Sequence, residues 1–547
     1  MGFTLAMLAI LPPSPRSADI SSNSFSAARA MDDVRIIANK PHPTGSIENA
    51  KVRTYLLRRL ETLGLDASES EGFVPDWALK RLNRWRGTDS TEQNFVNVIG
   101  TRRGVDSSKP ALLLMAHHDT VWDSPGASDD TIGVASILEI VRAINSGPQV
   151  ERDLIVLFTD AEEIGLVGAE HFFQNNPLRN KVGAIINFEA RGGGGTANMF
   201  QTSANNGNAA RLYAKAVKEP SASSLSAFVY NVLPNDTDLT EALDGGYLAY
   251  NIANLGDAEY YHSPKITVDA LDEATVQHMG SQGLDLTRAI LNADTLPKPR
   301  ADATYFDVFG LFMIVYSAAW GWVFLAFAAV FLSLTYDKHT ARKDILIGSS
   351  RVGLVFMLGG GLIFGLNLLS GASSGYYDRL AAIPKLEIMV GFAGLAIFFS
   401  LFGRGIQTRN GQLGIGLPLL ILGILGQALA STATYFITLP VMFYALSIFL
   451  LRSGTSQKIR SWVVALLSAL TLGYMIGLYH LLMLGVGPDL PSVAVLPFVL
   501  MALAIVPLFP GIEKRKSWTI AGVGLLLAIA TALWIRLDPV AATIPLY

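Results

Sequence analysis

Imidazole and carboxylate side chains that could bind metal ions and move a proton follow an apolar run early in the chain. Residues 111–130 read ALLLMAHHDTVWDSPGASDD, in which the run is followed by His117 and Asp119 and, after a Pro-Gly turn, by Asp129. His117 and Asp119 are two residues apart, so in an extended chain their side chains point to the same side. One of them can therefore bind a metal while the other fixes its orientation.

Further candidates follow later in the first 300 residues: Glu162 and Glu163, then Glu189, then His262. Taken singly, each has an ordinary interpretation, since acids are favoured in the first turn of a helix and an acid or a histidine can lie in a solvated loop. Together they provide two histidines and several carboxylates in a chain without cysteine. Such ligands suit catalytic zinc, and they are numerous enough for two metals that share a bridging carboxylate.

The elements that must position these residues can be predicted from hydrophobic periodicity. A helix is expected to begin after Ser46 as its N-cap and to stop at Gly64. Alternating apolar strands and helices predict an α/β fold with a mostly parallel, mixed sheet covered by helices on both faces. In such sheets, functional residues gather at the carboxyl ends of the strands. The expected strands are 95–100, 111–115, 154–159 and 182–188, and the other expected helices are 28–39, 131–145, 161–174 and 270–291.

The second half of the chain has a different composition, with long apolar runs separated by short basic loops. We expect a leader or partial membrane anchor plus linker over 1–27, the α/β domain over 28–295, a linker over 296–304 and an all-α polytopic transmembrane domain over 305–547. Asn367, Gln427 and His480 within it are interpreted as hydrogen-bonding groups between helices rather than as a transport path. The eight candidate spans are 309–335, 352–371, 388–403, 413–431, 434–451, 461–484, 492–509 and 518–535.

Five ordered motifs within residues 30–295 resemble the dizinc peptidases of metallopeptidase family 28. They are the HxD of residues 117–119, PGASDD of 125–130, EEIGLVGAEHF of 162–172, NFEARGGGG of 187–195 and YHSPKITVDALD of 261–272. The fourth motif, followed by a multi-spanning tail, most resembles the branch of the endoplasmic reticulum metallopeptidases and fungal vacuolar membrane proteases. In that branch a peptidase domain is fused to a polytopic membrane domain.

The resemblance implies a membrane-anchored exopeptidase, of aminopeptidase type, that binds two Zn²⁺ per chain and cleaves peptides. It also implies a cis bond between Asp129 and Asp130. Arg191, which stands where the branch often has a small residue, Asp236 and Tyr261 are candidates for substrate binding. The implied roles are His117 and Glu189 on one zinc, Glu163 and His262 on the other, Asp129 bridging both, Asp119 holding His117, and Glu162 as general base.

Other interpretations of the same chain are a glutaminyl-cyclase-like transferase, a non-catalytic binding or scaffold module, and a transporter with an appended peptidase. The presence of every implied ligand and of the base counts against an inactive scaffold. The scarcity of ionisable residues in the spans counts against a transporter. A net charge of -3 argues against a nucleic-acid partner.

The distribution of basic residues predicts the sidedness of the membrane half. Short basic loops stay in the cytoplasm, so we expect the preceding domain and the C-terminus on the non-cytoplasmic side, with a bacterial periplasm favoured over an organelle lumen. The loops after the odd-numbered spans hold Lys338, Arg342, Lys343, Arg351, Arg404, Arg409, Arg452, Lys458, Arg460, Lys514, Arg515 and Lys516. The other loops and the tail hold Arg379, Lys385 and Arg536.

Overall fold

The computed structural model describes residues 1–372, 377–406, 408–454 and 456–538. These residues form two compact units. The α/β unit is Leu11–Val315, and the helical unit comprises Met1–Ile10 and the described residues from Tyr316 onward. The C-terminal tail, which we expect on the same side of the membrane as the α/β domain, lies outside the described residues.

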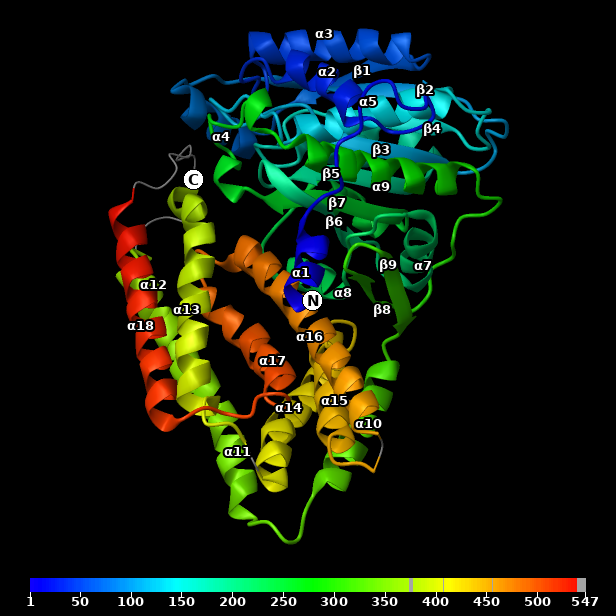
Figure 1. Ribbon diagram of the computed structural model, residues 1–547. Helices are drawn as coiled ribbons and strands as arrows, with labels where there is room; N and C mark the ends of the chain where they lie inside the picture. Colours follow the sequence, from blue (N-terminus) through cyan, green and yellow to red (C-terminus); the bar gives the residue numbers. More distant parts are fainter. Residues whose placement is uncertain (373–376, 407, 455, 539–547) are drawn as a thin grey trace. The chain divides into compact units, whose positions relative to one another are not determined.

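The α/β unit is built on a mixed sheet (Figure 1). Among the described residues this sheet has seven strands in the order β1-β2-β4-β3-β5-β7-β6. The central strands β4, β3, β5 and β7 run parallel, while β1, β2 and β6 pair antiparallel with their neighbours. The strands are β1 (Asp66–Phe73), β2 (Asn94–Arg102), β3 (Ala111–His117), β4 (Leu154–Thr159), β5 (Val182–Ala190), β6 (Gly194–Thr202) and β7 (Leu248–Gly256).

Both faces of the sheet are covered because successive side chains of a strand point to opposite faces. In β3, Leu112 and Leu114 join the larger core with α2, α3, α5 and α9, whereas Leu113 and Met115 join the core beneath α6. The mixed sheet covered on both faces confirms the predicted fold class. The helices are α2 (Ala27–Ile37), α3 (Ile47–Thr62), α4 (Asp76–Arg86), α5 (Thr131–Asn145), α6 (Val167–Asn175), α7 (Gly207–Ala216), α8 (Ser224–Val232) and α9 (Glu273–Leu291), with short 3₁₀ turns η1 (Pro177–Lys181), η2 (Asp238–Gly245), η3 (Ala258–Tyr260) and η4 (Val268–Ala270).

One expected helix begins later than predicted. The sequence favoured a helix over 161–174, but α6 begins at Val167 and the preceding residues form a turn. Ala161 and Leu166 have φ of 63° and 60°, and Gly165 has φ of 127°. Such left-handed backbone cannot continue a helix. Glu162 and Glu163 therefore lie in a turn after β4 and not in the first turn of a helix.

The helical unit contains the apolar segments that were expected to span a membrane (Figure 1). In the described part of the chain, five helices are long and apolar enough to do so: Lys343–Leu369 (α11 Lys343–Leu354, η5 Val355–Gly359, α12 Gly360–Leu369), Arg379–Phe402 (η6 Tyr377–Ala382 and α13 Ile383–Phe402), α14 (Arg409–Leu429), α16 (Gln457–Val486) and α18 (Lys514–Leu537). The first, fifth and seventh expected spans are shorter apolar helices: α10 (Trp320–Thr335), α15 (Tyr435–Leu450) and Pro491–Ile505 (η7 Pro491–Ala494, α17 Val495–Ile505). Helix α1 (Gly2–Ile10) belongs to this unit and packs against α16.

The expected span 309–335 is wrong at its beginning. The chain forms a hairpin of β8 (Ala303–Val308) and β9 (Phe312–Ser317), and helix begins only at Trp320. Phe309 and Gly310 have positive φ angles of 55° and 71°. This left-handed backbone forms the tight turn between the two strands. The segment that forms β9 is the short apolar run FMIVYS, and a short apolar run does not by itself distinguish strand from helix.

Polar groups inside the helical unit bond to neighbouring segments. Gln427 Nε2 donates to Ala318 O at 2.8 Å, and His480 Nδ1 lies 2.7 Å from Glu387 Oε1 on α13. Asn367 Nδ2 donates to Pro488 O at 3.4 Å. His480 thus links α16 to α13 as expected, whereas Gln427 and Asn367 bond to carbonyl groups of residues that lie outside the helices.

Buried His278 on α9 gives the α/β unit an acid-sensitive contact. Its Nδ1 accepts from Ala197 N–H at 3.1 Å, and Nε2 donates to Glu219 O at 2.9 Å, so the neutral ring is satisfied on both sides. Burial lowers the pKa of His278 from 6.5 to about 4. The unfolded state therefore binds the proton more readily, and stability present above pH 6.5 is lost as the pH falls towards 4.

We expect this histidine to contribute about 3 kcal/mol of stability at neutral pH that is lost near pH 4. Hydrogen exchange of peptides from α9 and β6, measured from pH 7 to pH 4 and corrected for intrinsic rates, should report this loss in the wild type. His278→Gln should weaken that pH dependence. His42, whose pKa burial also lowers to about 4, remains in both proteins, so the comparison isolates His278. Equal pH dependence in the two proteins would contradict the assignment.

Candidate active site

The acids and histidines singled out in the sequence converge at the carboxyl ends of the parallel strands. His117 is the last residue of β3, and Glu189 is the penultimate residue of β5. Asp129 directly precedes Asp130, whose side chain caps α5 by accepting from Gly133 N–H, and the bond between the two aspartates is cis as expected. The remaining members are Glu162 and Glu163 in the turn after β4 and His262 after β7.

Asp129 lies between two sets of nitrogen and oxygen atoms. Its Oδ1 is 3.0 Å from His117 Nε2, and its Oδ2 is 3.3 Å from His262 Nε2. On the first side Glu189 Oε2 is 3.9 Å from His117 Nε2, and on the second side Glu163 Oε2 is 3.1 Å from His262 Nε2. In each set the three donor atoms lie within 4.8 Å of one another. One carboxylate is thus shared by two groups that could each hold a metal ion.

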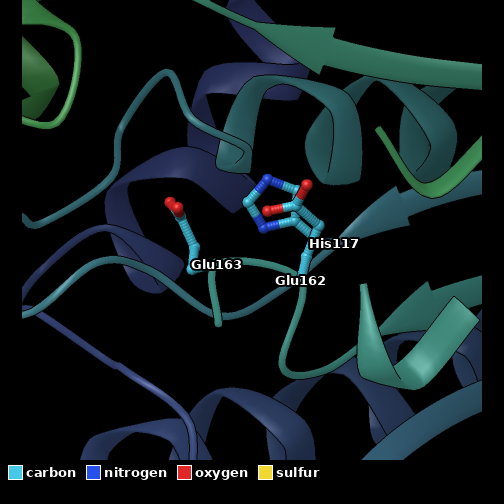
Figure 2. A group of neighbouring side chains, drawn as sticks. All are labelled: His117, Glu162 and Glu163. Carbon is cyan, nitrogen blue, oxygen red and sulfur yellow. The ribbon is translucent and has the colours of Figure 1, made fainter. Parts of the chain in front are cut away.

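Glu162 lies beside both sets without belonging to either. A donor atom of its carboxylate lies within 4.8 Å of donor atoms of His117 and Glu163. Figure 2 shows the Glu162 carboxylate at the His117 ring, with the Glu163 side chain pointing to the same side. This arrangement places the Glu162 carboxylate beside a residue of each donor set.

Asp119 connects His117 to the turn that carries the two glutamates. His117 Nδ1 is 3.0 Å from the Asp119 carbonyl oxygen and 3.6 Å from its carboxylate Oδ1. The same carboxylate accepts from Glu162 N–H at 3.1 Å and from Glu163 N–H at 3.3 Å. Thr44 Oγ1 also donates to it, at 3.2 Å. Asp119 therefore orients the imidazole ring and fixes the backbone of the acidic turn.

The crowding of buried charges shifts the acid–base behaviour of the site. Burial raises the pKa of Glu162 and of Glu189 well above the ordinary value, and neighbouring acids add to this effect. Burial alone would lower the pKa of His117, but the nearby acids, Glu162 foremost, hold it well above 6.5. Burial alone would raise the pKa of Asp129, but hydrogen bonds from His117 and His262 lower it to about 2. The cluster holds more acids than histidines, and bound cations would favour the charged forms of these acids.

The donor set fits divalent metal ions. Glu163 Oε1 and Glu189 Oε1 are buried and form no hydrogen bond within the described part of the chain. Buried carboxylate oxygens without a partner are costly unless an ion satisfies them. The available donors are imidazole nitrogens and carboxylate oxygens, since the chain has no cysteine, and this chemistry suits zinc with an open position for water.

Three candidates for substrate binding lie in different surroundings. Tyr261 stacks on His262, with ring centres 3.8 Å apart, and the Arg191 guanidinium carbon lies 5.9 Å from the Tyr261 ring centre. Asp236 is exposed. His118 turns away from the cluster, since its Nε2 bonds to Val96 O at 3.1 Å. Arg191 and Tyr261 are thus brought to the cluster, while Asp236 and His118 are not shown to contact it.

The sequence interpretation missed two residues near the cluster. Asp238 is fully buried and accepts a hydrogen bond from Thr159 Oγ1, and burial raises its pKa to about 7. Burial also raises the pKa of Tyr230, with further contributions from the negative charges of Glu189 and Glu162. Tyr230 lies on α8 and Asp238 begins η2, so neither residue follows the end of an apolar strand. The only sequence signal was the PNDTD of residues 234–238, from which Asp236 was selected instead of Asp238.

Comparison with known proteins assigns the α/β unit to a family. Residues 97–287 match the model of peptidase family M28. The chain carries an M28 peptidase domain. The matched range contains every ligand proposed from the motifs, and the predicted resemblance to this family is confirmed.

The curated relatives of this chain are named as membrane proteases and metallopeptidases. The vacuolar membrane protease of Eremothecium gossypii is 32% identical over 58% of this chain and 33% of the relative. The endoplasmic reticulum metallopeptidase 1 of Mus musculus is 29% identical over 61% of this chain and 39% of the relative. The chain therefore spans little more than a third of the length of these relatives. Their similarity extends beyond the 191 residues of the family match.

Solved structures to which this chain is similar include a zinc aminopeptidase from Bacillus subtilis. It is 13% identical, with a TM-score of 0.40, over 53% of this chain and all of that chain. A glutaminyl cyclase from Porphyromonas gingivalis is 19% identical, with a TM-score of 0.39, over 48% of this chain and 98% of that chain.

Proposed function

We propose that this protein is a membrane-anchored, zinc-dependent exopeptidase of aminopeptidase type. The observation that carries the proposal is the shared carboxylate of Asp129, which contacts His117 on one side and His262 on the other. Two zinc ions per chain would then be held by His117 with Glu189 and by Glu163 with His262. The M28 match and the names of the curated relatives support a peptidase as the class of enzyme.

Glu162 would serve as the general base of peptide hydrolysis. When bound, the two zinc ions polarise both the attacking water and the scissile carbonyl. Glu162 takes one proton from the water as its oxygen bonds to the carbonyl carbon. It then gives that proton to the amine as the C–N bond breaks, which leaves an acid and an amine.

The surroundings of Glu162 prepare it for this role. The Asp119 carboxylate holds the Glu162 backbone N–H at 3.1 Å, so the base is positioned before a substrate binds. The adjacent Glu163 faces His262 instead. Glu163 would therefore bind a metal ion while Glu162 acts as the base. Burial of the cluster strengthens the interactions of Glu162 with charge that develops on the substrate.

Purified full-length protein in detergent, loaded with zinc, tests the proposed function. We expect it to release the N-terminal residue from peptides with a free amino group and to leave N-acetylated peptides intact. An N-terminal glutaminyl peptide distinguishes hydrolysis, which frees glutamine, from cyclisation, which frees ammonia and leaves a pyroglutamyl peptide. Ammonia release without any peptide hydrolysis would replace the peptidase proposal with the cyclase, and no reaction on any peptide would contradict both.

We further propose that the M28 domain faces the non-cytoplasmic side of the membrane. The basic loops after the odd-numbered spans contact one another within the helical unit. Asn410 Nδ2 donates to Asp337 O at 3.1 Å, and Arg452 Nη2 donates to Gln412 Oε1 at 2.8 Å. Ile512 N–H donates to Gly403 O at 2.8 Å. Loops that share one end of a helical unit and carry most of its basic residues support a common cytoplasmic location.

A reporter enzyme that is active only outside the cytoplasm tests this orientation. Fused after Gly511, in the loop before α18, it is expected to be inactive because that loop lies with the basic cluster. Fused after Asp489, in the loop between α16 and η7, it is expected to be active. Immunoblots of both fusions provide the control for expression. Activity after Gly511 together with inactivity after Asp489 would reverse the proposed topology.

A further inference from the structure

A guanidinium group lies beside the proposed metal ligands at the end of β5. Arg191 follows Glu189 by two residues, and its guanidinium carbon is 5.9 Å from the centre of the Tyr261 ring. That ring stacks on His262 at 3.8 Å between ring centres and an interplanar angle of 23°. The Arg191–Tyr261–His262 stack therefore connects a cationic side chain, through one aromatic ring, to a proposed zinc ligand.

The backbone that carries Arg191 is held in place on both sides. The Arg191 N–H donates to Asn254 O at 2.9 Å, and Asn254 Nδ2 donates to Gly192 O at 2.7 Å. A Cβ at Gly192 would lie 2.0 Å from Gly256 O, so only glycine allows this close approach to β7. Ser128 Oγ also donates to Gly192 O, which ties the loop to the segment before Asp129. The backbone of Arg191 is thus fixed relative to the metal ligands.

The position of the guanidinium suits an anionic group at one end of a short peptide. The two ring separations keep it within about 10 Å of the His262 imidazole, and an extended chain advances about 3.3–3.6 Å per residue. This upper limit corresponds to a peptide of at most about three residues. The ligand cluster itself is acidic, so it repels a carboxylate that is not compensated by a cation. The planar guanidinium group of an arginine can donate two parallel charge-assisted hydrogen bonds to one carboxylate.

We propose that Arg191 binds the C-terminal carboxylate of di- and tripeptides whose first peptide bond lies at the metal cluster. This inference rests on the proposed peptidase function and adds a substrate class, namely short peptides with a free C-terminus. The tyrosine between Arg191 and His262 holds the guanidinium by cation–π contact, so the carboxylate meets a group that is already oriented.

Paired substrates measured with full-length zinc-loaded protein test the inference. One pair is leucyl-alanine and its C-terminal amide, and a second pair is the tripeptide leucyl-alanyl-alanine and its amide. A third pair, leucyl-glutamate amide and leucyl-glutamine amide, carries the carboxylate on a side chain instead of the terminus. The proteins are wild type, Arg191→Gln, Arg191→Lys and, as a matched control on α7, Arg211→Gln.

We expect wild type and Arg211→Gln to prefer the free acids over their amides by about 10- to 100-fold in kcat/KM. In Arg191→Gln this ratio should fall towards one, and Arg191→Lys should give an intermediate value because a point charge replaces the fork. The ratio of two substrates in one variant cancels any loss of folded enzyme.

An acid-to-amide ratio that is the same in wild type and Arg191→Gln would overturn the inference while leaving the peptidase function intact. A second result would also overturn it: Arg191→Gln changes the rate ratio only for leucyl-glutamate amide and leucyl-glutamine amide. Arg191 would then bind a side-chain carboxylate and not the C-terminus. Absence of hydrolysis of every peptide by the wild type would remove the proposed function together with the inference.

Discussion

Glu162→Gln is expected to lower kcat of peptide hydrolysis by about 10²–10⁴ while both zinc ions stay bound. Glutamine has nearly the same shape but cannot take a proton from water. The donor atoms of the two proposed metal sets belong to other residues, so the metal content should not change. The Asp119 carboxylate accepts from the backbone N–H of residue 162, and this contact survives the substitution.

The measurement combines zinc analysis with kcat and KM on the same preparation. Glu170→Gln is a matched control, since Glu170 lies on α6, where its carboxylate accepts from Gln174 Nε2 at 3.0 Å. That control should retain wild-type kcat. Near-normal turnover by a Glu162→Gln protein with full zinc content would refute the role of this residue as general base.

Asp129→Asn is expected to lower zinc content and activity together. An amide presents one weak oxygen donor and one N–H₂ group, so it cannot bridge two cations as a carboxylate does. His117 and His262 would also lose the carboxylate that lies 3.0 Å and 3.3 Å from their Nε2 atoms. We therefore expect zinc content well below two per chain and a loss in kcat/KM of more than about 100-fold.

Asp32→Asn is the control for this substitution, because Asp32 is exposed and pairs only with Arg35 on the surface of α2 among the contacts of the described residues. It should retain zinc and activity. Two zinc ions in a folded, active Asp129→Asn protein would show that the carboxylate is not shared between metals.

The sequence predicted best those helices and strands whose residue types are determined by burial in the core. Strand β4 and helix α5 have the predicted bounds, because a continuous apolar run and a 3.6-residue period are strong signals. Strand β1 was not predicted. It is the edge strand Asp66–Phe73, whose residues DASESEGF are largely exposed and show no apolar pattern. Strands β6 and β7, which are well buried, were not assigned either.

The candidate site could be predicted where its residues follow the ends of apolar strands, as His117 and Glu189 do. Asp238 could not be found in this way, since it reaches the interior through the packing of η2 against α6 and β7. Its buried contact with Thr159 at the end of β4 depends on the order of strands in the sheet and not on local sequence. Asp236, two residues earlier, has the same chemistry but is exposed.

The central claim is that two metal ions share the Asp129 carboxylate. Anomalous X-ray scattering on either side of the zinc edge, from crystals of the zinc-loaded protein, tests this claim most directly. The account predicts two peaks about 3.5–4 Å apart. One should lie beside His117 and Glu189, the other beside Glu163 and His262, with Asp129 contacting both. A single peak, or two peaks of which Asp129 contacts only one, would contradict the account.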